Sequence, residues 1–154
     1  MLTPLQRFIT SIEDRIATFE TQSRTANDIA SWFHDAHAFV TVADGTGEIV
    51  GYAIAQAYAD RCCYRGIGEF SVYVRRNRRR QGIGQLAMKA LIEHSRTKDL
   101  WKLISRIFPE NEASLSLLMR MGFRVVGVHE KHRKLDGVWK DCVLVELLIP
   151  ENID

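Results

Sequence analysis

The 154-residue sequence has only three cysteines and no long apolar run, and each shortage excludes a class of protein. Cys62, Cys63 and Cys142 cannot all pair within one chain and show no C-x-x-C spacing, which disfavours a disulfide framework or a zinc site. No apolar run reaches the roughly 18 residues of a membrane span, and the first residues lack the apolar core of a signal peptide. We therefore expect a cytoplasmic protein with reduced thiols.

The sequence also has little net charge. Its 21 Lys+Arg and 19 Asp+Glu residues give a formal charge of +2, too small to indicate a nucleic-acid or membrane binder from bulk charge alone. The arginines are nevertheless concentrated, because five of the six residues 75–80 are arginine. Without those five the balance is 16 basic against 19 acidic residues, so a single basic segment lies on a slightly acidic protein.

Length and hydrophobic pattern predict one domain over residues 1–154. The chain is 46% hydrophobic and contains no repeat or Pro/Gly/Ser linker. The patterns predict helices at 5–19, 26–33, 84–96 and 111–121, and strands at 38–43, 49–58, 69–74, 101–108, 123–129 and 138–149. Mixed helices and strands in this order favour an α/β (α+β) fold around one sheet.

The segment 73–85 combines the end of a strand, the basic turn and the start of a helix. Free N–H groups and the positive dipole end make a helix N-terminus an anion site, and Gly82 and Gly84 allow close approach of a ligand such as a diphosphate. The segment lacks the Lys-Ser/Thr pair of a P-loop, and no acidic residue closes a following strand as dinucleotide-binding folds require. A solvated turn or an RNA-binding patch remain alternative interpretations.

Two motifs in this chain resemble those of the GNAT acetyltransferase superfamily. R-x-x-G-x-G is present as Arg79, Gly82 and Gly84, directly after a strand. Downstream, Asn-Glu-Ala-Ser at 111–114 is followed by Met-Gly-Phe at 121–123. The stretches 12–21, 105–111 and 134–141 narrow the match to the phosphinothricin/arsinothricin N-acetyltransferase branch, and the resemblance covers about residues 12–149.

The resemblance implies a GNAT-type fold with a single mixed, mostly antiparallel sheet flanked by helices. The first strand is expected to be missing or altered, because only twelve residues precede Glu13. The implied reaction is transfer of acetyl from acetyl-CoA to the primary amine of a phosphinothricin- or arsinothricin-like amino acid, by direct attack in a ternary complex. The implied role is antibiotic resistance, and the implied assembly is a homodimer.

The resemblance also implies site residues. Glu69 is the expected catalytic base, and a carboxylate that opens an otherwise apolar strand is consistent with that role or with a solvated strand end. The expected acetyl-CoA contacts are Val72, Tyr73, Val74, Arg79, Arg80, Gln81, Gly82, Ile83, Gly84, Gln85, Asn111 and Ser114. Many superfamily members have a tyrosine where this chain has Leu118, and that tyrosine acts as a general acid on the leaving thiolate. The sequence therefore does not identify the group that protonates the thiolate here.

Candidate contacts for an anionic amino-acid substrate are Arg24, Arg61, Tyr64, Arg133 and Asp136. No metal site is expected, because the histidine pairs at 34/37 and 129/132 lack a third ligand within reach. Alternative acceptors are methionine sulfone or sulfoximine, a polyamine or a protein N-terminus. An RNA-binding module is a further alternative, but the preferred interpretation expects no nucleic-acid or membrane partner.

Overall fold

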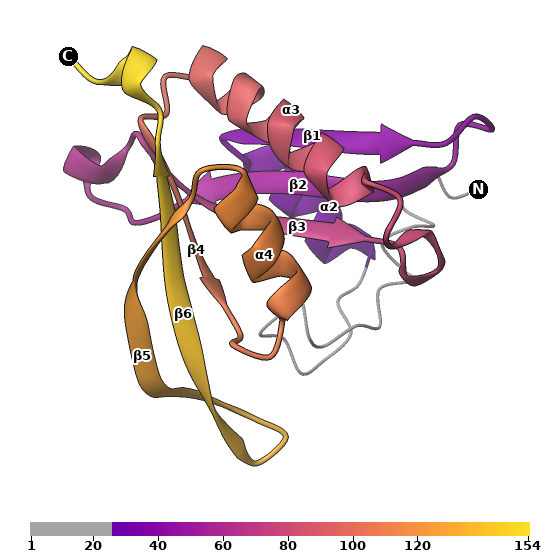
Figure 1. The fold of residues 1–154 in the computed structure, drawn as a ribbon. Helices are drawn as coiled ribbons and strands as arrows, with labels where there is room; N and C mark the ends of the chain where they lie inside the picture. Colours follow the sequence, from indigo (N-terminus) through magenta and orange to yellow (C-terminus); the bar gives the residue numbers. More distant parts are fainter. Residues whose placement is uncertain (1–25) are drawn as a thin grey trace.

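The computed structural model describes residues 26–154, which form a sheet with helices on both faces (Figure 1). The helices are α2 (Ala26–Asp35), α3 (Ile83–Thr97) and α4 (Glu112–Arg120), with short 3-10 turns η1 (Cys62–Tyr64), η2 (Arg76–Arg78) and η3 (Pro150–Asn152). The strands are β1 (Ala38–Ala43), β2 (Ile49–Ala57), β3 (Ile67–Val74), β4 (Lys102–Ile107), β5 (Arg124–Leu135) and β6 (Val138–Leu148). The predicted helix 5–19, the expectation about the first strand and Arg24 lie outside the described residues.

The six strands form one sheet in the order β1-β2-β3-β4-β6-β5. Every neighbouring pair is antiparallel except β3 and β4, which are parallel because α3 connects them across one face. The prediction of a mixed, mostly antiparallel sheet with flanking helices is therefore confirmed.

Alternation along β2 shows how the two faces of the sheet are covered. Ala53 and Ala55 point to one side and join the core formed with α3 and α4. Tyr52 and Ile54 point to the other side, where they pack with Phe33 of α2. The small alanines let α3 lie close to the sheet, and Gly51 extends this contact, since a Cβ there would lie 2.9 Å from the Ile83 side chain.

The strands β3 and β4 separate soon after they meet. Their pairing covers only Ile67–Glu69 on β3 and Lys102–Ile104 on β4. Beyond this point β3 continues to Val74 and β4 to Ile107, and Figure 1 shows the two strands diverging. Within the described residues, one edge of the second half of β3 therefore lacks a partner strand, which leaves main-chain groups available in the middle of a sheet.

The structure extends β5 beyond its predicted end. The strand was expected to stop at His129, but it runs to Leu135 with an irregular register between His129 and Arg133. Lys131 adopts a φ of 46° there, and its N–H donates a 2.8 Å hydrogen bond to Asp141 Oδ1. The polar sequence of this segment hides the strand because both of its faces are largely exposed.

The three cysteines differ in exposure. Cys142 is buried, whereas Cys62 and Cys63 are exposed, so the three thiols have different surroundings. Among residues 26–154, no helix is long and apolar enough to cross a membrane.

Candidate active site

The free edge of β3 presents its main-chain groups in a defined direction. Arg75 N–H donates a 2.8 Å hydrogen bond to Val50 O of the β2 side. Because peptide groups alternate along a strand and the β2–β3 register is continuous, the N–H and C=O groups of Val72 and Val74 face away from β2, into the gap beside β4. Arg79 Nε reaches the Val74 carbonyl at 3.3 Å, which agrees with this direction.

The helix α3 begins without a side-chain cap. Gly82 is its N-cap residue, with φ at 77°, and a Cβ added there would meet no atom within 4 Å. Gly82 is exposed, and no side chain caps the first N–H groups of α3, which lie at the positive end of the helix dipole. Arg80 also has a positive φ of 64°, an uncommon conformation for a residue with a side chain. The arrangement suits a diphosphate held by backbone N–H groups.

The two glycines of this turn have different roles. Gly82 is required by its positive φ and leaves space for a ligand. Gly84 has no such requirement, since a Cβ at this position would make ordinary contacts, at 3.4 Å from Leu117 of α4 and 3.6 Å from Val74. Gly84 therefore lies where the start of α3 meets α4 and the end of β3.

The helix α4 closes one side of the same region. Asn111 caps it, because the Ser114 N–H donates a 3.3 Å hydrogen bond to Asn111 Oδ1. Leu118 is fully buried in the core between α4 and the sheet. Leu118 therefore has a packing role, and its helix carries no tyrosine to act as an acid.

Glu69 lies in the last paired position before β3 and β4 separate. Its carboxylate forms an ion pair with the Arg106 guanidinium of β4, on the face of the sheet that α2 covers. The two side chains are 32% and 36% exposed for Glu69 and Arg106 respectively, so solvent or a substrate can reach both. Sequence reasoning missed Arg106, although a lone arginine between Ser105 and Ile107 in a buried strand was a usable signal.

Three of the proposed substrate contacts lie in two separate elements. Arg61 is the N-cap of the turn η1 before β3 and Tyr64 is its last residue, with the Tyr64 ring in edge contact with Tyr58 at 5.7 Å between centroids. Arg133 lies on β5 opposite Lys140.

The buried thiol of Cys142 is influenced by the charges of both Arg106 and Arg133. Burial raises the pKa of the Cys142 thiol, and the charges of Arg106 and Arg133 oppose that rise. Both guanidinium groups therefore lie within electrostatic reach of the same buried thiol, on the side of β4 and β6 that leads to Glu69.

Asp136 lies far from Glu69 within this chain. It occupies the tight turn between β5 and β6, where Asp136 and Gly137 have φ of 50° and 80°. Glu69 is level with Ile104 of β4, which pairs with Glu146 of β6. Glu146 lies eight residues along β6 from the start of that strand at Val138, or about 26 Å at the usual rise per residue. The hairpin therefore carries Asp136 well beyond the end of β4 (Figure 1).

Neither histidine pair gathers a metal-binding set in the described range. The rings of His129 and His132 stack at 4.6 Å between centroids. Across residues 26–154 no group of three or more His, Cys, Asp or Glu side chains is placed to hold an ion.

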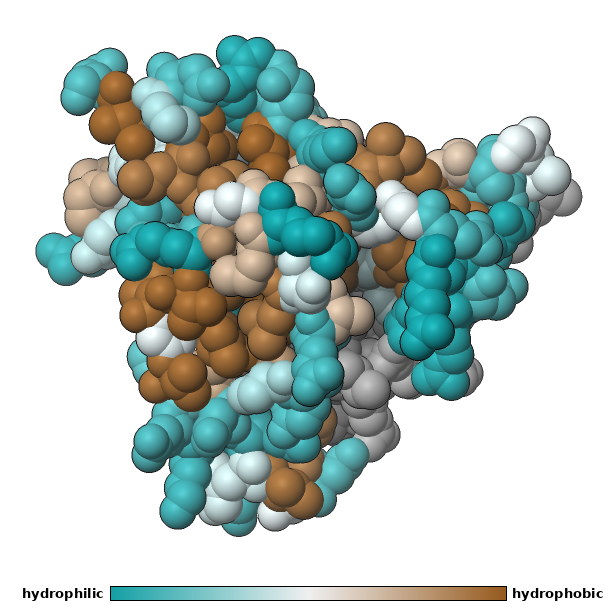
Figure 2. Space-filling model, in the orientation of Figure 1, coloured by the Kyte–Doolittle hydropathy of each residue, from teal (hydrophilic) through white to brown (hydrophobic). Residues whose placement is uncertain are grey.

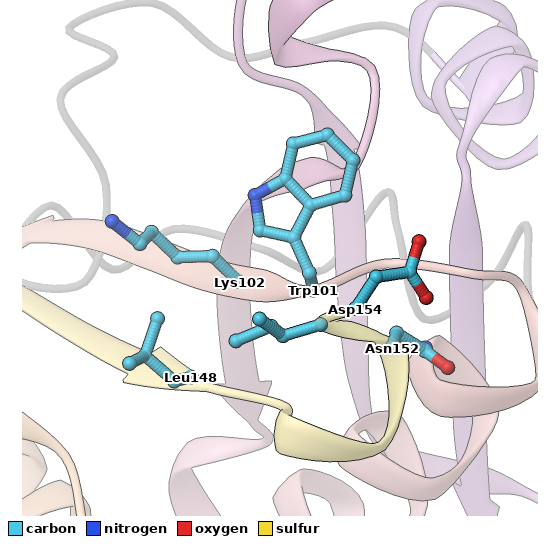
Figure 3. A pocket seen from close by; sticks show the side chains of 6 residues that line it. Trp101, Lys102, Leu148, Asn152 and Asp154 are labelled. Atoms are coloured by element: carbon cyan, nitrogen blue, oxygen red, sulfur yellow. The ribbon is translucent and has the colours of Figure 1, made fainter.

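A shallow pocket lies at the other end of β4, away from the gap (Figure 3). Its lining residues are Trp101, Lys102, Leu148, Asn152, Ile153 and Asp154. Asn152 Nδ2 donates 2.8 Å hydrogen bonds to the carbonyls of Arg96 and Leu100, which ties the C-terminal turn to the end of α3. The Asn152 side chain thus stabilises this corner of the fold.

The gap beside β3 and the helix start that follows it together define an acyl-CoA-binding fold. Main-chain groups of an open strand can pair with an extended amide-bearing arm, and an uncapped helix N-terminus can hold its diphosphate. Residues 7–123 match the model of the Acetyltransferase (GNAT) family, and the chain belongs to that family.

Curated relatives and solved structures agree with this assignment. The chain is similar to the L-methionine sulfoximine/L-methionine sulfone acetyltransferase of Pseudomonas aeruginosa, at 30% identity over 88% of this chain and 73% of that protein. It is 33% identical to the phosphinothricin N-acetyltransferase of Streptomyces coelicolor, over 79% and 75% of the two chains. A GNAT phosphinothricin acetyltransferase from Sinorhizobium meliloti, solved in complex with AcCoA, matches with a TM-score of 0.86 at 25% identity, covering 94% and 83%.

These findings confirm the predicted family, enzyme class and cofactor. The protein is an N-acetyltransferase of the GNAT family, and its acetyl donor is acetyl-CoA.

Proposed function

We propose that the protein transfers the acetyl group of acetyl-CoA to the primary amine of a phosphinothricin- or arsinothricin-like amino acid, as a resistance enzyme. The observation that supports this most is Glu69, a solvent-reachable carboxylate placed where β3 and β4 separate. The names of similar proteins support the substrate class, since they refer to methionine sulfoximine and to phosphinothricin.

The proposed cofactor site follows the open edge of β3. Main-chain groups of Val72 and Val74 bind the extended arm, and the first turn of α3 with Gly82 binds the diphosphate. The remaining proposed contacts are Tyr73, Arg79, Arg80, Gln81, Ile83, Gly84, Gln85, Asn111 and Ser114. When bound, acetyl-CoA supplies the activated acyl group for direct transfer in a ternary complex.

Glu69 is proposed to accept a proton from the substrate. A primary amine is an ammonium ion near neutral pH and has no lone pair until it loses a proton, so the site needs a base. Glu69 shares the α2 face with Ser71 and Tyr73, three side chains in alternation along β3, and lies about 10 Å along the strand from Val72. A carboxylate at this position can receive the proton of an amine that enters the gap.

A second copy of the chain is proposed to complete the assembly as a homodimer. Val125, Val126 and Val128 of the edge strand β5 are 43–55% exposed, and Figure 2 shows apolar side chains gathered over this strand. The projecting hairpin carries Asp136 out of reach of its own Glu69, so in a dimer it could serve the partner's site. Arg133, and with it Arg24, Arg61 and Tyr64, are retained as candidates for the anionic head group.

We further propose that residues 1–154 form one acetyltransferase domain that works in the cytoplasm, without nucleic-acid or membrane partners. The family match over residues 7–123 and the continuous sheet through β6 support a single domain. Another amine, such as a polyamine or a protein N-terminus, is the alternative acceptor.

A thiol-release assay with acetyl-CoA tests the proposal. The panel contains phosphinothricin, arsinothricin, L-methionine sulfoximine, spermidine and a peptide with a free N-terminus. We expect CoA release with the amino acids and formation of their N-acetyl products by mass spectrometry. Turnover restricted to spermidine or the peptide would favour the alternative acceptor, and no turnover with any amine would refute the proposal.

A further inference from the structure

The sheet face that α2 covers carries two clusters of opposite charges with different exposure. In one, Glu146 of β6 bonds both Lys102 at 3.1 Å and Arg124, and its side chain is only 10% exposed. In the other, Glu69 pairs with Arg106 alone among residues 26–154, and both side chains are about one-third exposed. The first cluster is closed by two cations, whereas the second can still take a ligand.

The reachable pair is complementary to a free α-amino acid. Such a molecule carries an ammonium and a carboxylate on one carbon, with the opposite signs to the Glu69 carboxylate and the Arg106 guanidinium. Glu69 and Arg106 come from neighbouring strands and their side chains already meet in an ion pair, so one small molecule can contact both of them at once. Carboxylates pair with arginine in a planar, two-bond geometry that other cations do not offer.

We propose that Arg106 is a specificity-determining residue that binds the α-carboxylate of the acceptor while Glu69 receives its ammonium group. This inference rests on the proposed function and deepens it, because it restricts the acceptor to free amino acids. When an amino acid binds, its ammonium and carboxylate join the Glu69 carboxylate and the Arg106 guanidinium. The four charges alternate in sign and sum to zero. An amine without a carboxylate instead brings a second positive charge to Glu69, beside Arg106, and is rejected by repulsion.

The surroundings of Glu69 and Arg106 determine how a bound amino acid is oriented. Arg106 lies opposite Leu144 of β6, and Ile104 lies two residues before it on the same face of β4, so apolar neighbours flank it on its own strand and the next. Glu69 opposes Gln56 of β2. The carboxylate of a bound amino acid is thereby directed toward β4, and its amine toward β3, whose free edge faces the proposed acyl group.

Three substrates that differ only at the carboxylate test the proposal. They are L-methionine sulfone, its carboxamide, and 3-(methylsulfonyl)propylamine, which lacks the carboxyl carbon. In the wild type we expect kcat/KM to fall about 10- to 100-fold from the acid to either of the others, the usual effect of a lost charge-assisted bond. Arg106→Met should reduce kcat/KM for the acid by a similar factor and leave the carboxamide and the amine nearly unchanged or improved. Arg106→Lys should recover part of the loss.

Arg124→Met is the matched control, since it removes a guanidinium from an ion pair on the same face and leaves Glu69 untouched. It should keep the wild-type preference for the acid, and thermal unfolding by circular dichroism should show that both methionine variants are folded. An equal loss for all three substrates in Arg106→Met would mean that Arg106 only positions Glu69, and would overturn the proposal.

Calorimetric binding separates this inference from the proposed function. L-methionine sulfone and its carboxamide are titrated into the enzyme with CoA present, without any acetyl donor. Tighter binding of the acid that disappears in Arg106→Met supports the proposal even if turnover fails. Equal binding of acid and carboxamide to the wild type would overturn it, whereas failure of the proposed function appears as absent acetylation despite binding.

Discussion

Arg78 donates a 2.9 Å hydrogen bond to the carboxylate of Asp44, and this pair joins the basic turn after β3 to the β1–β2 turn. The Thr46 hydroxyl and the Thr46 N–H also donate to Asp44 Oδ1, at 2.6 and 2.9 Å. These hydrogen bonds, with smaller help from Arg78, hold the pKa of Asp44 below its ordinary value. One arginine of the basic segment is therefore used to position the segment itself.

Replacing Asp44 should weaken cofactor binding without removing any cofactor contact. Asp44→Ala frees Arg78 and loosens the turn that leads to α3, so we expect CoA affinity to fall a few-fold in calorimetric titration. Asp99→Asn, in the turn at the opposite end of α3, is the control and should bind CoA as the wild type does. Unchanged affinity in Asp44→Ala would show that the turn keeps its shape without this anchor.

Gly82 and Gly137 form a natural comparison. Both have φ near 80°, and at both a Cβ would meet no atom within 4 Å, but only Gly82 starts α3. Valine at either position costs about 1–3 kcal/mol of folding free energy through backbone strain. We expect Gly82→Val to bind CoA at least tenfold more weakly, roughly 1.4 kcal/mol, and Gly137→Val to bind it normally despite a similar loss of stability. Equal CoA affinity in the two variants would contradict a diphosphate site at Gly82.

Glu69→Gln should reduce turnover while sparing cofactor affinity. The amide cannot accept the ammonium proton, and loss of a general base costs about 10²- to 10⁴-fold in rate. The measurement is kcat near neutral pH together with the Kd for acetyl-CoA by calorimetry. A variant with full kcat would remove Glu69 from the proposed role.

Glu146→Gln should destabilise the sheet in a pH-dependent way. Its hydrogen bonds to Lys102 and Arg124 outweigh desolvation and hold the pKa of Glu146 below the ordinary value of 4.5. A folded-state pKa below the unfolded one contributes stability above about 4.5, and that contribution disappears as the pH falls through the folded-state pKa. We expect a loss of about 1–3 kcal/mol in urea unfolding at pH 7.

The difference between wild type and Glu146→Gln should shrink as the pH is lowered below 4.5. Glu93→Gln is the control, because Glu93 pairs with Arg96 on the exposed surface of α3 and should unfold like the wild type. A pH-independent gap between the two proteins would mean that Glu146 acts by packing alone.

The three cysteines should react at two distinct rates. Cys62 and Cys63 are exposed, whereas burial of Cys142 both shields its thiol and raises its pKa. With a chromogenic disulfide reagent near pH 8 we expect two thiols to react promptly and the third only after unfolding in urea. Three prompt thiols would place Cys142 at the surface. Cys62→Ser with Cys63→Ser should leave only the slow reaction.

The sequence was sufficient to predict the helices and strands that bury one face with a regular period. Apolar residues repeat at the helical period in α3 and at the strand period in β3 around Val72. Both elements appear where they were predicted. The end of β5 was missed because His129 to Arg133 is polar on both faces, and only pairing with β6 makes it a strand. The bounds of this hairpin therefore depend on a contact between distant residues.

In the candidate site, too, residues that are adjacent in the sequence were predicted and residues brought together by the fold were not. The basic turn and Gly82 lie together in the sequence and were found there, whereas Arg106 is 37 residues from Glu69 and meets it only because β3 and β4 are neighbours. Asn111 was expected as a cofactor contact, and the structure shows that its side chain also caps α4. Whether it also touches acetyl-CoA stays a prediction, as do the other proposed contacts.

The short junction between β3 and β4 also sets how the two halves of the sheet can move. Only three pairs of residues join them there, with Glu69 and Ile104 as the outermost. If the halves rotate relative to each other, the junction is the pivot, and displacement grows with distance from it. Glu69 lies within the junction and would move little, while the Val74 end of β3 would move most. The unpaired end of β3 can thus shift to meet a long, flexible cofactor while the proposed proton acceptor moves little.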